Sequence, residues 1–315
     1  MIAVVLAGLD TSAAAQTAPQ DIVREVTRNV TEAASLLPWW GWSMLLFVVT
    51  FLLGIVSVLG GVGGGVLFVP VVGGLFPFHL DFVRGTGLLI ALAGALAAGP
   101  TLLRGGMANL RLAMPPALIA SIAAVVGANI GLALPERAVQ FALGVAIFGV
   151  VSIMTVARKS AYPEVRKPDA LSTALGMHGI FHDTFSGKDI VWRIHRAPLG
   201  LALFVLIGML AGLFGIGAGW ANVPVLNLVM GAPLKIAVGS SSFILSVVDS
   251  AAAWVYLNQG AMLASVAVPS VLGMMTGSTI GVGLLARANA TIIRRLVIGL
   301  LLAAGTRALL KGLGL

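Results

Sequence analysis

The chain alternates between long apolar segments and short polar connections from residue 41 onward. Most segments are close to the ~20 residues that an α-helix needs to cross a hydrocarbon layer ~30 Å thick. Five segments precede the one long polar stretch, residues 158–197, and five follow it. They span 41–59, 62–77, 84–103, 112–133 and 137–157, then 198–213, 216–230, 235–257, 262–285 and 291–310. This pattern predicts an all-α polytopic membrane protein with about 8–10 transmembrane helices.

Two segments are shorter than the rest, and both begin at a glycine cluster, GGVGGG at 60–65 and GIGAG at 215–219. Glycine inside a helix costs about 1 kcal/mol relative to alanine. Backbone groups left unpaired in lipid cost several kcal/mol each, so a break is tolerated only where protein buries it or where it lines a cavity. We therefore predict that these two helices are broken or re-entrant.

The two groups of segments are copies of each other. One constant shift places Gly54, Gly61, Gly63, Gly65, Pro70, Gly85, Gly106 and Pro115 on Gly208, Gly215, Gly217, Gly219, Pro224, Gly239, Gly260 and Pro269. Because each copy has an odd number of segments, the second copy enters the membrane from the opposite side. The sequence thus predicts two inverted repeats of five apolar segments, a common architecture of secondary transporters.

The distribution of basic residues predicts the orientation and the domains. With the N-terminus outside, most of the 19 Lys and Arg fall in loops on the inner side. The positive-inside rule then places both ends outside and residues 158–197 in the cytoplasm. We expect transmembrane repeats at 41–157 and 198–315. Residues 1–40 are expected to form a periplasmic segment that is either signal-like or an interfacial helix.

Composition excludes several functional classes. Hydrophobic residues make up 59% of the chain and charged residues 10%, against about 25% charged in soluble domains. The net charge of +8 is explained by topology-setting Lys and Arg, so no nucleic-acid partner is expected. The sequence has no cysteine, no P-loop, no dinucleotide fingerprint and no nucleophile–base arrangement. We therefore expect neither an enzyme nor a cofactor.

The glycine clusters are the first candidate site. A helix that starts after a break presents free N–H groups and a positive dipole end, which together bind anions. Inverted repeats allow two such ends to converge near the membrane midplane. Close packing of small residues is the alternative role. The candidate backbone positions are Gly61, Gly63, Gly64, Gly65, Gly215, Gly217 and Gly219.

Polar side chains near the breaks extend this candidate site. The hydroxyls of Thr86 and of Ser240, Ser241 and Ser242 begin equivalent spans in the two copies, and Asn222 lies in the second broken segment. These groups can replace the hydration of an oxyanion without fixing a counter-charge. Alternatively, the hydroxyls bond to carbonyls of their own helices.

Two charged residues are candidates for an anion entrance or for coupling. Asp249 is the sole acid well inside an apolar span, and intramembrane acids are functional candidates. It would carry a coupling proton or pair with a cation such as Arg84. Arg84, at the start of a span, would draw anions in or simply snorkel to the interface.

The central loop contains HGIFHD, with His178 and His182 four residues apart and Asp183 adjacent. That spacing would suit zinc on a helix. The same stretch also fits a hairpin around Ser186 and Gly187, which would separate these side chains. We expect a folded loop and no metal.

The two breaks, GGVGGGVLFVP followed by GTG and GIGAGWANVP followed by GSSS, resemble the TauE/SafE sulfite-exporter family over about residues 50–310. The resemblance implies a secondary transporter that exports sulfite, sulfoacetate or a related organosulfonate across a bacterial inner membrane. Ala218 stands where the first copy has Gly64, and the central loop is large. These two differences from the family pattern bear on which anion the protein selects.

The function predicted from these features is export of a small sulfur-containing anion by alternating access around the glycine breaks. An anion channel is one alternative, and a membrane scaffold or sensor acting through residues 158–197 is another. The expected partners are the small anion, the lipid bilayer and, as an option left open, further copies of the chain.

Overall fold

A computed structural model describes residues 39–60, 63–76, 78–104, 108–156, 163, 165, 167–183, 188–217, 219–285 and 290–314. The longer helices are α3 Trp39–Gly60, α4 Gly64–Leu75, α5 Leu80–Arg104, α6 Leu110–Ala133, α7 Glu136–Val156, α9 Ala197–Phe214, α11 Leu234–Asn258, α12 Ala264–Leu285 and α13 Ala290–Leu313. The short elements are α8 Ala170–Ala174, β1 His178–Asp183, β2 Lys188–Arg193, α10 Gly219–Pro224 and the π-helix η1 Val225–Val229. The described part is therefore mostly helical. The expected signal-like or interfacial segment falls almost entirely outside it.

Seven of the described helices are long and apolar enough to cross a membrane, namely α3, α5, α6, α7, α9, α11 and α12. Helix α4 is apolar but has only 12 residues. These helices confirm a multi-pass membrane protein. The prediction of an all-α fold holds for the membrane part, whereas the central loop adds a β-hairpin.

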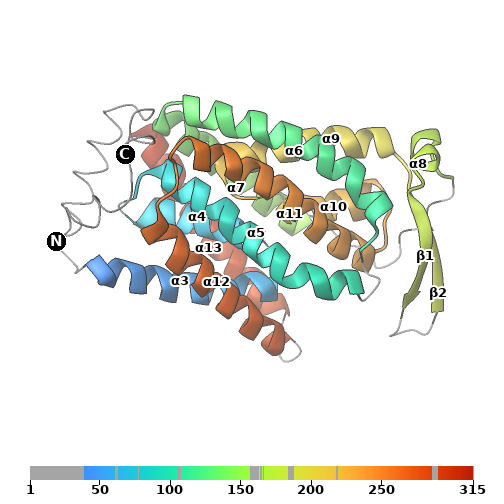
Figure 1. The fold of residues 1–315 in the computed structure, drawn as a ribbon, viewed down its shortest axis with the longest axis horizontal. Coiled ribbons are helices and arrows are strands. Elements are labelled where there is room, and N and C mark those ends of the chain that lie inside the picture. The colour runs from blue at the N-terminus through green and yellow to red at the C-terminus, as the bar shows by residue number, and fades with distance from the viewer. Residues whose placement is uncertain are drawn as a thin grey trace.

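The helices run along the long axis of the molecule, and the β1–β2 hairpin lies beyond one end of the bundle (Figure 1). The start of α3 and the end of α13 lie at the opposite end. Helix α3 packs mainly on α12, α6 on α9 and α7 on α13, while α11 contacts both α5 and α6. Helices distant in sequence therefore pair across the centre.

The closest contacts between paired helices occur at glycine residues. A Cβ atom built on Gly212 of α9 would collide with the backbone of Ala124 on α6, and one on Gly277 of α12 would collide with that of Phe51 on α3. Small residues allow helix backbones to approach in this way inside a membrane. The α6–α9 and α3–α12 pairs thus both pack closely through a glycine.

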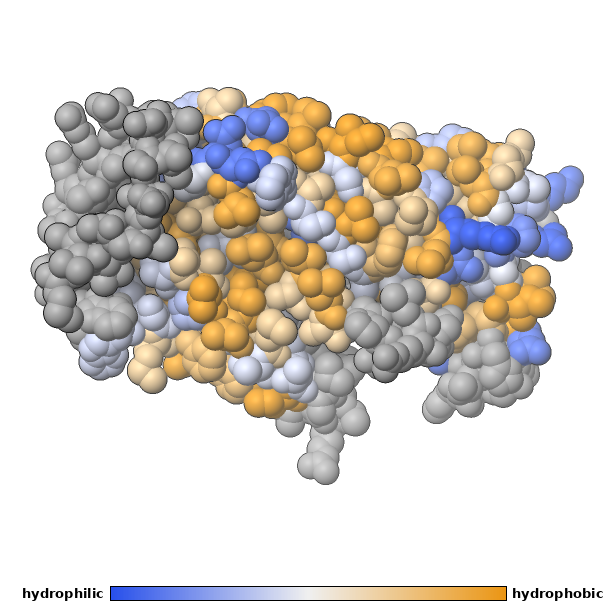
Figure 2. All heavy atoms as spheres, in the orientation of Figure 1, coloured by the Kyte–Doolittle hydropathy of each residue, from blue (hydrophilic) through white to orange (hydrophobic). Residues whose placement is uncertain are grey.

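The core is formed by two hydrophobic clusters. One joins α6, α9, α10 and α11 to the hairpin, and the other joins α3, α4, α5, α7 and α13. Trp220 packs against both clusters. On the face seen in Figure 2, apolar residues cover the middle of the bundle and hydrophilic residues gather toward its ends. That distribution is typical of a protein with lipid around its middle.

Candidate functional site

The GGVGGG cluster lies at the junction of α3 and α4. Helix α3 ends at Gly60, and α4 begins at Gly64 with Gly63 as its N-cap. Gly63 has φ −58° and ψ 142°, and no side chain caps the helix. The first N–H groups of α4 therefore face the break. Gly61, also predicted for this site, lies outside the described residues.

The second break separates α9 from α10. Gly215 and Gly217 have φ values of +68° and +71°, in the left-handed region that favours glycine. A Cβ atom on Gly215 would also run into the backbone of Arg84. The backbone conformation thus favours glycine at positions 215 and 217.

The two glycine clusters approach each other at Gly63 and Gly219. A Cβ atom on Gly219 would lie 3.5 Å from Cα of Gly63, and one on Gly63 would lie 3.8 Å from Cα of Gly219. A Cβ atom on Gly65 would lie 2.8 Å from the carbonyl oxygens of both Gly87 and Ile216. Close packing therefore explains Gly65 by itself. Anion binding at the meeting point remains a prediction.

Asp249 lies beside the second break. Its side chain is fully buried on α11, and a Cβ atom on Gly217 would lie 3.2 Å from Oδ2 and 2.9 Å from Cβ of Ala91 on α5. The fold thus brings together the intramembrane acid and a glycine break. In sequence they were two separate candidates.

Several buried polar atoms have no hydrogen-bond partner within the described residues, and three of these groups belong to elements at the glycine clusters: the Asn222 amide, the indole N–H of Trp220 and the hydroxyl of Thr86. Asn222 is fully buried and lies one helical turn after Gly219. Leaving such a group unsatisfied costs about 1–3 kcal/mol. Groups retained at that cost are candidates for ligand binding.

Trp220 was not among the residues predicted from the sequence for this site. Comparison of the two sequence copies did not single it out, because the corresponding residue of the first copy is Val66. The available signal was a tryptophan inside an apolar segment, away from the interfaces where this residue gathers. In the structure it follows Gly219 directly at the start of α10.

The predicted hydroxyl groups separate into different roles. Thr86 is fully buried one turn before Ile90, whose Cγ2 would lie 3.1 Å from a Cβ atom on Gly64. Ser240 accepts a 3.1 Å hydrogen bond from the backbone N–H of Asn109 at the start of α6. Ser242 donates to the carbonyl of Val238 on its own helix, 3.4 Å away, and Ser241 is buried. Thr86 alone lies near a break with an unused hydroxyl.

Arg84 lies in the second turn of α5 and is 1% exposed. Its guanidinium donates to Asp81 at 2.6 Å, to the carbonyl of Gly131 at 3.2 Å and to that of Leu213. Its Cζ also lies 5.2 Å from the ring centroid of Tyr256. Backbone and ion-pair contacts, and not snorkelling to an interface, therefore account for its position. A role in drawing anions in remains a prediction.

The central loop forms an antiparallel hairpin in which His178 pairs with Arg193 and His182 with Asp189. Four residues of strand span about 13 Å. The helical zinc arrangement is therefore wrong for His178 and His182. Within the described residues no group of three His, Cys, Asp or Glu could hold a metal ion.

Comparison with known proteins bears on the whole membrane part. The family model described as Sulfite exporter TauE/SafE matches residues 46–308. The chain is 27% identical over 211 residues to the probable membrane transporter protein YunE of Bacillus subtilis (strain 168), covering 64% of this chain and 73% of that protein. No solved structure matches the chain.

Proposed function

Because the chain belongs to the sulfite exporter TauE/SafE family of membrane transporters, we propose that it exports a small sulfur-containing anion, such as sulfite, sulfoacetate or a related organosulfonate. The proposed membrane is the bacterial inner membrane, with both chain ends outside and the central loop in the cytoplasm. The proposed mechanism is alternating access around the place where the two glycine breaks meet.

The observation that carries this proposal is the contact between Gly63 and Gly219, with unpartnered Asn222 one turn away. The start of α4 supplies N–H groups and a partial positive charge. Asn222 and Trp220 add neutral donors from α10, and Thr86 adds one from α5. Neutral donors suit an anion that must also leave, because no fixed counter-charge holds it.

Asp249 suggests how transport is coupled to an ion. Two negative charges ~4 Å apart repel by about 4 kcal/mol at an effective dielectric constant of 20. An anion held at Gly217 would lie close to the Asp249 carboxylate. A proton on Asp249 removes that repulsion, so we propose that anion and proton bind together.

The helix pairings support the proposed inverted repeat. In such a repeat α3, α5 and α6 would correspond to α9, α11 and α12. The counterpart of the α3–α12 pair is then α9–α6, and the counterpart of the α5–α12 pair is α11–α6. All four pairs are in contact. Single contacts also correspond. A Cβ atom on Gly54 would meet the carbonyl oxygen of Met274, and one on Gly208 that of Ala120.

The test replaces Asn222 by leucine. We expect Asn222→Leu to leave the apparent melting temperature unchanged or raised, because it removes an unsatisfied buried amide. We expect sulfite or sulfoacetate flux in proteoliposomes to fall at least about tenfold, the effect of losing roughly 1.4 kcal/mol of binding to the transported anion.

The matched control is Asn227→Leu on the same segment. Asn227 donates to the carbonyl of Ala232 at 2.8 Å, so its loss should lower stability by about 1–3 kcal/mol. Full flux in a stable Asn222→Leu protein would contradict the proposed site.

A further inference from the structure

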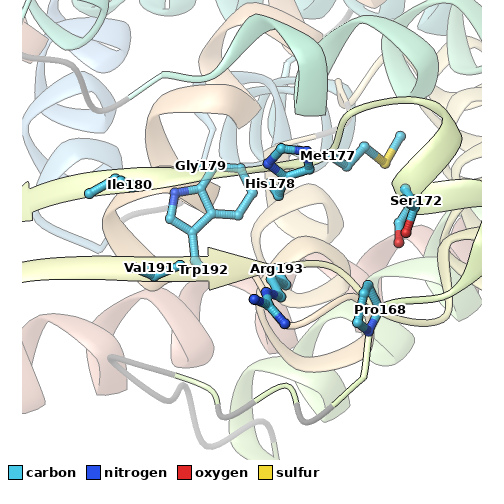
Figure 3. Close-up of a pocket in the computed structure, with 10 residues that line it drawn as sticks. Pro168, Ser172, Met177, His178, Gly179, Ile180, Val191, Trp192 and Arg193 are labelled. Carbon is cyan, nitrogen blue, oxygen red and sulfur yellow. The ribbon is translucent and has the colours of Figure 1, made fainter.

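A separate cavity lies between α8 and the base of the β1–β2 hairpin. Its volume is about 430 Å³, within the range of about 300–1,000 Å³ that is usual for small-molecule sites. Figure 3 shows lining side chains from α8 and the residue Pro168 before it, and others from both strands. The proposed transport site does not include any residue of this lining.

The lining combines positive charge with apolar surface. Arg193 and His178 are cross-strand partners, both are exposed, and both line the cavity. No carboxylate is among the lining residues. Within the described part of the chain, no ion pair or hydrogen bond engages the Arg193 guanidinium. An anionic group would therefore find an available bidentate donor here.

The apolar part of the lining shows what else the ligand must carry. Met177 and Trp192 are 1% and 5% exposed and form buried wall, whereas Ile180 and Val191 face each other across the strands at 71% and 66% exposure. A hydrated inorganic ion gains nothing from such surface. An organic anion would cover it and gain about 25 cal/mol per Å² of apolar area.

The hairpin is also connected to the segment that carries Asn222 and Asp249. Trp192 and Phe181 belong to the hydrophobic cluster of α10 and α11, and Nζ of Lys235 in the first turn of α11 lies 5.9 Å from the Phe181 ring centroid. The backbone N–H of His195 donates to the carbonyl of Met230, directly after η1, at 3.0 Å. Trp192 lies between Val191 and Arg193 on β2, so the strand that carries Arg193 is anchored in the same hydrophobic cluster as α10 and α11.

We propose that this cavity binds a small organic anion with an apolar body, through Arg193 and His178, and that occupancy changes the transport rate. The regulatory half of this inference rests on the proposed transport function, whereas the binding half does not. The same chemistry occurs in a free metabolite and in an anionic lipid headgroup.

The binding test uses the full chain in nanodiscs of zwitterionic lipid. Isothermal titration calorimetry with 1-naphthalenesulfonate should show binding that the neutral 1-naphthalenesulfonamide lacks. Arg193→Gln should raise Kd by about tenfold or more, and Arg193→Lys by less, because a charged hydrogen bond contributes about 1.5–3 kcal/mol. Arg137→Gln, which changes an exposed arginine outside the cavity, should leave Kd unchanged.

The following outcomes decide between these possibilities. Equal affinity of wild type and Arg193→Gln, or equal binding of the neutral amide, overturns the site.

Repeating the titration with phosphatidylglycerol in the nanodisc distinguishes the two sources of the ligand. A raised Kd for naphthalenesulfonate identifies a lipid headgroup, and an unchanged Kd identifies a soluble anion. If wild type transports sulfite and saturating naphthalenesulfonate alters that flux less than about twofold, or alters it equally in Arg193→Gln, regulation through the cavity is wrong. If wild type transports no sulfite, the proposed function fails while calorimetry still decides the cavity.

Discussion

At the scale of single residues, the polar groups that the sequence proposes for the site differ in whether the fold already uses their hydrogen-bonding capacity. Ser240 and Ser242 have their hydrogen bonds within the protein, whereas Asn222 and Thr86 have none among the described residues. All four looked alike in sequence. The position of a polar residue along a predicted helix can be read from the sequence. The neighbouring group that forms a hydrogen bond with it cannot.

Arg84 illustrates the same distinction for charge. Its guanidinium joins α5 to the C-terminal ends of α6 and α9, where helix carbonyls carry a partial negative charge. Asp81 supplies the formal counter-charge. We infer that Arg84 positions the end of α9 from which the second break starts.

Replacing Arg84 by methionine should therefore cost about 3–5 kcal/mol of stability, because Asp81 and two carbonyl groups lose their donor. Unfolding in detergent, followed by circular dichroism, measures the loss. The double variant Asp81→Asn/Arg84→Met should recover part of it. Arg137→Met, at an exposed position, should stay within about 0.5 kcal/mol of wild type. An equal effect at both arginines would show that the buried contacts contribute little.

At the scale of elements, glycine has two separate uses in this chain. In the helix pairs it allows backbones to touch, and at Gly215 and Gly217 it permits a left-handed turn. Both uses were considered from sequence. The sequence located the two glycine clusters, and only the packing shows which glycines need to lack a side chain.

Gly212→Ala should test the packing role. The new Cβ would meet the Ala124 backbone on α6, which cannot rotate away as a side chain can, so we expect destabilisation by about 1–3 kcal/mol. Gly149→Ala on α7 is the matched control, since nothing lies within 4 Å of its Cβ position. It should be neutral or gain up to about 1 kcal/mol from helix propensity. Thermal unfolding of the two variants compares them directly, and equal shifts would contradict close α6–α9 contact.

The hairpin was one of two interpretations of the central loop, and the structure selects it. In the hairpin, His178 lies beside Arg193 of the other strand. In a helix, His178 would lie beside His182, one turn later. Two histidines at this spacing are compatible with both periods, so local sequence alone could not choose between them.

At the scale of the whole molecule, the orientation is testable because the chain has no cysteine. The hairpin and the α6–α7 connection lie toward opposite ends of the bundle (Figure 1). We expect Ile180→Cys to react with a membrane-impermeant maleimide only from the cytoplasmic side, and Arg137→Cys only from the outside. Both positions are exposed. Labelling of both from one side in intact cells would contradict the predicted topology.

The sequence by itself determined that the protein is a multi-pass membrane protein of the TauE/SafE family, and it located the two glycine clusters. It could do so because segment length, hydropathy and the repeat are properties of the chain taken in order. Only the tertiary structure decided that Gly63 meets Gly219, that Asp249 lies against Gly217 and that Trp220 packs against both hydrophobic clusters. These contacts join residues from different helices, and which helices pair depends on side-chain packing across the whole bundle.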